Sequence, residues 1–159
     1  MKNFRVGVGY DIHQLKNNNK LILGGVLIPH YKGTVAHSDG DVVIHAICDA
    51  LLGAAGLGDI GHFFPDDDDS FKDIDSTVLL KKVFKMIKQN SFFVVNIDVS
   101  IVLEVPKLKD YLLEMKSQIS KCINISENDI NIKATTSEKL GFVGREEGVA
   151  CYATTLIAC

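Results

Sequence analysis

The segment FRVGVGYDIHQL, at residues 4–15, decides how the rest of the chain is organised. Its hydrophobic residues stand at every second position and alternate with polar residues or glycine, which is the period of a β-strand. Asp11 and His13 therefore project from the same face of this strand. A carboxylate beside an imidazole can be a solvent-exposed edge, an ion pair or part of a metal site, and this pair alone does not decide among them.

The period of the hydrophobic residues predicts the other elements of the chain. Period two predicts further strands, over 21–29, 92–105, 130–136 and 149–158. Period 3.6 predicts helices, over 36–56 and 77–90, with a third opening at Pro106. We expect Ser38 or Asp39 to cap the first helix, and Asp75 or Ser76 the second. These elements predict one α/β domain of α+β character over residues 1–159, with a mixed sheet and helices packed on one side.

Composition argues against several classes of protein. The net charge of −3 does not favour a wide nucleic-acid or anionic-membrane surface. No hydrophobic run reaches the roughly 18 residues of a membrane span. The four cysteines include no C-x-x-C pair, so we expect reduced thiols in a cytosol-like compartment. The polar start MKNFR is not typical of a signal peptide, although a longer precursor could carry a targeting segment.

The helix predicted over 36–56 contains a second histidine, His45, with Asp41 four residues before it and Asp49 four residues after it. Such a row is often no more than a hydrogen-bonded surface. Together with Asp11 and His13, however, His45 makes a set of two imidazoles and a carboxylate. Catalytic zinc takes three such ligands and leaves a fourth position open.

Two other motifs mislead. GLGDIG at 56–61 matches a dinucleotide-binding fingerprint, but it closes a helix instead of opening one, so we reject that interpretation. The acidic run PDDDDSFKDID, from Pro65, resembles a calcium loop but lacks the residues that such a loop needs. We therefore expect an ordinary solvent-exposed loop, in which only Asp66 is a candidate for a functional role.

The segment KATTSEKLGFVGREEG, at 133–148, follows a predicted strand and is rich in hydroxyl groups, glycine and cations. Loops of this kind bind phosphates through backbone N–H groups and a cation, although an ordinary polar loop looks the same. Glu138 could bring Mg²⁺ to a diphosphate. No Ser-His-Asp or Cys-His relay is evident, so the chemistry that we expect is positioning and charge stabilisation.

The chain closely resembles the 2-C-methyl-D-erythritol 2,4-cyclodiphosphate synthase family of the non-mevalonate isoprenoid pathway, in essentially its whole length and in order. The matching stretches are DIH at 11–13, AHSDGDVVIHAICDALLGAAGLGDIG at 36–61, HFFPDDD at 62–68, PKL at 106–108 and KATTSEKLGFVGREEG at 133–148. The resemblance implies that 4-diphosphocytidyl-2-C-methyl-D-erythritol 2-phosphate is cyclised with release of CMP. Either a bacterial cytoplasm, or the stroma of a plastid-type organelle after removal of a transit peptide, fits the lysine-, asparagine- and isoleucine-rich composition.

The resemblance also implies roles for particular residues. The zinc ligands are Asp11, His13 and His45, and Glu138 holds Mg²⁺ or Mn²⁺. The groups that polarise the reacting phosphates are His37 and Thr136, and Asp49 supports a zinc histidine. The remaining implied residues contact the substrate, with the cytidine pocket formed by 103–109 and Thr135. They are Ser38, Asp59, Ile60, Gly61, Phe64, Pro65, Asp66, Asp68, Leu103, Pro106, Lys107, Leu108, Lys109, Thr135, Phe142 and Arg145.

Family members are homotrimers with their sheets round a three-fold axis and each active site between two subunits. We expect the strand faces with Ile97, Val99 and Ile101 to serve this assembly as well as the core. A central cavity bordered by Phe142 and Arg145 can hold an isoprenoid diphosphate in relatives. Tyr152 stands where several of them have glutamate, so we expect weaker binding of such a ligand here.

The two alternatives are another enzyme and a protein of a different functional class. A zinc-dependent phosphodiesterase would release CMP and an open-chain product, whereas a non-catalytic trimeric binder would not depend on His45 or Glu138. The presence of all the implied metal-binding and catalytic residues favours the synthase.

Overall fold

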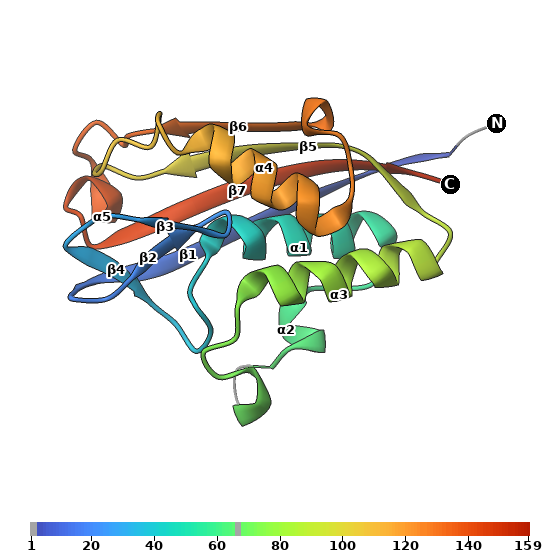
Figure 1. Ribbon diagram of the computed structural model, residues 1–159, viewed down its shortest axis with the longest axis horizontal. Coiled ribbons are helices and arrows are strands. Elements are labelled where there is room, and N and C mark those ends of the chain that lie inside the picture. The colour runs from blue at the N-terminus through green and yellow to red at the C-terminus, as the bar shows by residue number, and fades with distance from the viewer. Residues whose placement is uncertain (1–2, 66–67) are drawn as a thin grey trace.

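The computed structural model describes residues 3–65 and 68–159, and Figure 1 shows a layer of strands with helices packed on one side of it. The order of the strands in the main sheet is β4-β1-β7-β5-β6. Only the β5–β6 pair is parallel, so the sheet is mixed, as predicted. The strands of this sheet are β1 (Phe4–Asn17), β4 (Lys32–Val35), β5 (Phe93–Val102), β6 (Ile130–Thr135) and β7 (Gly148–Ala158).

The stretch predicted as one strand over 21–29 instead forms a separate hairpin, because Gly24 and Gly25 make the turn with positive φ angles. Its strands are β2 (Leu21–Leu23) and β3 (Val26–Ile28). The α-helices are α1 (Val42–Ala55), α2 (Ile60–Phe63), α3 (Ser76–Gln89), α4 (Leu112–Ile123) and α5 (Gly141–Gly144). The described residues also form 3₁₀ turns at Asp69–Phe71 and Glu127–Asp129. Within the described residues, no helix has the length and hydrophobicity needed to cross a membrane.

The two faces of β1 are used in the opposite way from an ordinary amphipathic strand. Gly7 and Gly9 lie directly under α1, where an added Cβ would come within 1.9 Å of the carbonyl oxygens of Ala50 and Ala46. Glycine at these positions therefore lets the helix lie against the sheet. The large hydrophobic residues of the strand point away from the helices and are exposed. They are Phe4, Val6, Val8, Tyr10 and Ile12.

The hydrophobic residues of β5 face the helices. Ile97, Val99 and Ile101 are almost completely buried in the core, at 0–1% exposure. The prediction that they also serve a contact between subunits is therefore wrong, because side chains alternate along a strand and this set points inward. Most of the exposed hydrophobic residues of the sheet belong to β1, and the others are Val35 of β4, Phe93 of β5 and Tyr152 of β7.

The helices begin later than predicted at two places. Asp41, not Ser38 or Asp39, caps α1 and accepts hydrogen bonds from the backbone of Val43 and Ile44. The third helix, α4, begins at Leu112 because the segment after Pro106 forms a loop in which Leu108 is buried. The prediction for α3 is confirmed: Asp75 is its cap, and its side chain accepts a hydrogen bond from Thr77 N.

Candidate metal centre and active site

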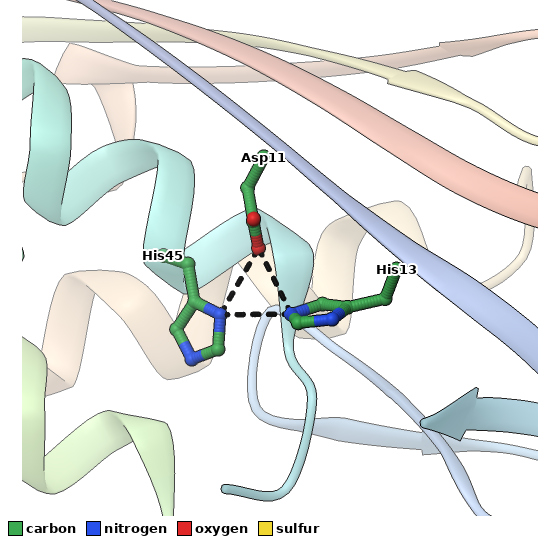
Figure 2. A group of neighbouring side chains, drawn as sticks. All are labelled: Asp11, His13 and His45. Carbon is green, nitrogen blue, oxygen red and sulfur yellow. Dashed lines mark hydrogen bonds and ion pairs between the residues drawn. The ribbon is translucent and has the colours of Figure 1, made fainter. Parts of the chain in front are cut away.

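Asp11, His13 and His45 meet where β1 passes the first turn of α1 (Figure 2). Oδ2 of Asp11 lies 3.0 Å from Nδ1 of His45 and 3.1 Å from Nε2 of His13. The two nitrogens are 3.3 Å apart. The three atoms form a nearly equilateral triangle, which confirms that the strand and the helix bring these residues together.

The size of this triangle fits a small tetrahedral metal ion. Zinc ligands at about 2.0–2.1 Å in tetrahedral geometry lie about 3.3 Å from one another. The donors also fit, because imidazole and carboxylate are the ligands of catalytic zinc sites. Among the described residues, no other group of three His, Cys, Asp or Glu side chains gathers in this way.

Folding changes the acidity of two of these groups. Burial disfavours the charged form of Asp11, but hydrogen bonds and positive charge from His13 and His45 outweigh it and hold its pKa well below its usual range. Burial would likewise lower the pKa of His45, but the hydrogen bond to Asp11 and its negative charge raise that pKa above its ordinary value. The charged forms of Asp11 and His45 therefore stabilise each other.

The second ring nitrogen of His45 meets two hydroxyl groups, of which only that of Ser38 belongs to a residue predicted for the site. Its Nε2 lies 2.9 Å from the hydroxyl of Ser76 and 3.3 Å from that of Ser38. Ser76 in turn donates a short hydrogen bond to Asp39. The sequence signalled neither contact, because Ser76 and Asp39 stood out only as candidate helix caps.

Asp49 lines the cavity of the candidate ligands, but its hydrogen bond is with the backbone of α2. Its Oδ1 accepts a hydrogen bond from Ile60 N at 2.7 Å, which fixes the start of α2. No hydrogen bond links it to His13 or His45 in the described part of the chain. The groups that contact Nε2 of His45 are instead the hydroxyls of Ser76 and Ser38.

A cavity of about 350 Å³ opens in front of the three candidate ligands. His37 lies at this cavity, where its Nε2 is 3.2 Å from the backbone oxygen of Asp68. Asp59 caps α2 by accepting a hydrogen bond from His62 N at 2.9 Å. Asp66 lies outside the described residues. The predicted residues that line the cavity are Asp11, His13, His37, Ser38, His45, Asp49, Ile60, Gly61 and Phe64.

The residues predicted for the cytidine pocket gather around a different cavity, of about 420 Å³, beside the end of β6. The hydroxyl of Thr136, at this cavity, donates to Glu138 at 3.0 Å. Ser137 binds the carboxylate of Glu104 through its backbone N–H and its hydroxyl, which ties the loop after β6 to the loop after β5. The predicted residues that line this cavity are Leu103, Pro106, Lys107, Leu108, Lys109, Thr135 and Thr136.

The two cavities have no lining residue in common, so one chain holds His37 and Thr136 in separate places. Phe142 lines a third cavity, of about 200 Å³, together with Tyr10 and Tyr152. Arg145 forms an exposed ion pair with Glu147. A further cavity, of about 600 Å³, lies beside the β2–β3 hairpin and includes none of the three candidate metal ligands.

The mixed sheet with helices on one side, and the carboxylate and two imidazoles beside β1, define an α/β protein with a candidate metal site. The chain belongs to the YgbB family, whose model matches residues 4–158. The resemblance inferred from the sequence is confirmed by curated relatives named 2-C-methyl-D-erythritol 2,4-cyclodiphosphate synthase. The relative from Prosthecochloris aestuarii is 52% identical over 96% of this chain and 98% of its own length. One from Clostridium botulinum strain Okra is 52% identical over 96% of this chain and 99% of its own.

Solved structures show the same fold. The bifunctional IspDF from Campylobacter jejuni has a TM-score of 0.96 and is 44% identical over 99% of this chain, which spans 43% of that longer chain. A CDP complex of IspF from Plasmodium falciparum has a TM-score of 0.86 and is 35% identical, covering 98% of this chain and 96% of that one.

Proposed function

We propose that this chain cyclises 4-diphosphocytidyl-2-C-methyl-D-erythritol 2-phosphate to 2-C-methyl-D-erythritol 2,4-cyclodiphosphate and CMP. An oxygen of the 2-phosphate attacks the β-phosphorus of the same molecule. The bond from that phosphorus to the oxygen bridging it to the α-phosphate breaks, and CMP leaves with that oxygen. The curated relatives carry the name of this reaction, and one solved relative is a CDP complex.

The observation that carries the proposal is the triangle formed by Asp11, His13 and His45 at the mouth of a cavity. Its donors suit Zn²⁺, which would supply a Lewis acid for phosphoryl oxygens. In the described residues the cavity has no cysteine, and its one serine, Ser38, lies 3.3 Å from Nε2 of the His45 ring, which the metal would hold through Nδ1. The cavity therefore suits a reaction in which the nucleophile belongs to the substrate and the protein supplies orientation and charge.

The protein groups around the triangle have separate tasks in this proposal. His37 and Ser38 line the same cavity as the triangle and are placed to donate hydrogen bonds to phosphate oxygens. Thr136 supplies a hydroxyl from the second cavity to the reacting diphosphate. Glu138, which is exposed beside it, would hold Mg²⁺ or Mn²⁺ together with the diphosphate.

The separation of the two cavities supports an active site shared between copies of the chain. The uncovered face of the sheet carries the exposed hydrophobic side chains of β1, and a monomer seldom leaves so many together. Packing of three such faces round an axis would bring the metal cavity of one subunit to the cytidine pocket of the next. We propose this homotrimer as the active form.

The residue at position 152 bears on whether an isoprenoid diphosphate binds on the axis of the trimer. Tyr152 stacks against Tyr10 with ring centroids 4.7 Å apart, beside the cavity that Phe142 lines. A phenol there supplies no carboxylate to pair with Arg145. We expect farnesyl diphosphate to bind to this protein more weakly than it binds to relatives that have glutamate at this position. Equal affinities of the two proteins in titration calorimetry would refute this.

The reaction is tested by ³¹P NMR of the zinc-loaded protein with the substrate and Mg²⁺. We expect the two coupled resonances of a cyclic diphosphate together with CMP, and loss of both after zinc is chelated. CMP with an open-chain product would make the protein a phosphodiesterase instead. Zinc-loaded protein without any turnover would favour a binding role.

A further inference from the structure

The buried side of His45 is held by a chain of hydrogen bonds from two neighbouring segments. Nδ1 of the ring faces the metal triangle, whereas Nε2 lies 2.9 Å from Oγ of Ser76. Ser76 is completely buried and is the first residue of α3. A histidine that binds a metal is oriented by the group that its other ring nitrogen meets, so Ser76 is in the position that sets the ring of His45.

The direction of these hydrogen bonds is fixed by Asp39. A carboxylate can only accept, so the hydroxyl of Ser76 must donate its proton to Oδ1 of Asp39. Oγ of Ser76 then has only lone pairs left for His45, and Nε2 of the ring must carry the hydrogen. Asp39 is held in turn by the backbone N–H groups of Ser76, at 2.9 Å, and Asp41, at 3.2 Å.

We propose that Asp39 and Ser76 are positioning residues that hold neutral His45 as the Nε2–H tautomer. The lone pair of Nδ1 is then free and points at the other two ligands, ready for the metal. Because Ser76 begins α3 and Asp39 precedes α1, the two residues also align the ends of the helices that flank the metal centre. This inference rests on the zinc site proposed above.

Ser38 does not replace Ser76 in this role. Its Oγ is farther from Nε2, at 3.3 Å, and it accepts a hydrogen bond from Gly40 N at 3.2 Å. No carboxylate contacts the Ser38 hydroxyl among the described residues, so nothing fixes the direction of its proton. Ser38 also lines the cavity, where substrate can compete for it.

The first test measures Zn²⁺ affinity by competition with a chromophoric chelator, without substrate. We expect one Zn²⁺ per wild-type chain and an affinity about 10- to 100-fold lower in Ser76→Ala, the usual effect of losing an outer partner of a ligand. Asp39→Asn should weaken binding at least as much. The amide of this variant can donate to Oγ of Ser76, so the Ser76 hydroxyl can donate to Nε2 of His45 and favour the Nδ1–H tautomer, which cannot bind the metal through Nδ1.

The second test reads the tautomer directly, by long-range ¹⁵N–¹H correlation spectra of the metal-free proteins at alkaline pH. The wild type should show His45 protonated at Nε2, and Asp39→Asn should show a shift of the population toward Nδ1–H. A purely structural role for Asp39 would leave the tautomer unchanged. This measurement does not depend on turnover or on zinc binding.

Thr155→Val is the matched control. Thr155 is also completely buried, and its hydroxyl donates to Ala50 O of α1 at 3.2 Å, away from the metal centre. We expect its zinc affinity to equal that of the wild type. If both site variants fold and bind zinc like the wild type, or if the control loses as much affinity, the positioning role is wrong. If the wild type itself binds no zinc, the proposed metal function fails instead.

Discussion

At the scale of residues, Nδ1 of His45 can hold either a proton or a metal ion, because each would lie between it and the Asp11 carboxylate. Folding lowers the pKa of Asp11, so the stability it contributes exists above its unfolded value of about 4 and is lost as the pH falls. Folding raises the pKa of His45. Its contribution is complete below about pH 6.5 and is lost as the pH rises through the raised pKa.

The pKa shifts of Asp11 and His45 have opposite directions, and together they predict how zinc affects thermal stability at different pH values. In the metal-free protein the pair stabilises the fold most between about pH 4 and pH 6.5. Zinc requires neutral His45, so the increase in Tm on adding zinc should be small at acidic pH and should grow toward pH 8. Scanning calorimetry checks this. An increase in Tm that is equal at acidic and alkaline pH would contradict a metal bound through Nδ1.

Glu138 offers a prediction for the second metal ion. Glu138→Gln keeps the size of the side chain and its hydrogen bond with the hydroxyl of Thr136, but removes the negative charge. We expect an unchanged zinc content and a turnover that stops or needs much more Mg²⁺, because Mg²⁺ is bound by carboxylates together with phosphate oxygens. Turnover measured across a Mg²⁺ titration tests this prediction, and Glu147→Gln, which removes an exposed carboxylate elsewhere, is the control. An unchanged Mg²⁺ dependence would mean that Glu138 has another role.

At the scale of elements, Asp41 joins α1 to the β2–β3 hairpin. Its carboxylate is completely buried and accepts N–H groups from Gly24, Gly25, Val43 and Ile44. Burial raises its pKa to about 6, although these donors favour the ionised form. One side chain therefore fixes the helix that carries His45 against a separate piece of sheet.

Replacing this cap should be far more harmful than replacing the cap of α3. Asp41→Ala leaves four N–H groups without their acceptor, three of them in buried hydrogen bonds, and we expect a loss of about 3 kcal/mol in the free energy of unfolding. Asp75→Ala, at an exposed cap, should lose about 1 kcal/mol. Urea denaturation of both variants at equal protein concentration measures the difference. Equal losses would show that the bridge to the hairpin adds nothing.

The same elements show how far the sequence could predict the structure. Hydrophobic period predicted β5 and α3 well, because one face of each packs on the core. It misplaced the start of α1, since three carboxylate or hydroxyl residues near 38–41 can all cap a helix and only the tertiary contact with Gly24 and Gly25 selects Asp41. The hydrophobic period could not show the hydrogen bond between His45 and Ser76, because these residues are 31 positions apart and nothing local links them.

At the scale of the whole molecule, the uncovered face of the sheet predicts self-association. Val8 is in the middle of this face and 66% exposed in the single chain. Val8→Lys should bring like charges together if three faces meet, and so give monomers that still bind zinc but have no turnover. Leu113→Lys, at a residue of α4 that is 77% exposed, is the control and should behave like the wild type. Analytical ultracentrifugation measures the oligomeric state of each variant, and a monomeric wild type would refute the proposed trimer.

A shared active site makes a sharper prediction, because two inactive variants should restore each other. His45→Ala destroys the metal cavity of its own chain, and Thr136→Ala damages the second cavity, which would serve the site of a neighbour. Each variant alone should have little turnover. In trimers reassembled from an equal mixture, a site works only where an intact metal cavity meets an intact second cavity. Chance places them together in about one quarter of the sites, for three subunits related head to tail.

Reassembly from denaturant followed by assay of CMP release therefore gives a quantitative test. Turnover near a quarter of the wild-type value in the mixture, against almost none in each variant treated alone, would establish that neighbouring chains complete one another's sites. A mixture no more active than its components would mean that one chain forms the whole site. The chain would then have to bring Thr136 to His37 by a movement of the loops after β5 and β6, which are tied together by the bonds from Ser137 to Glu104.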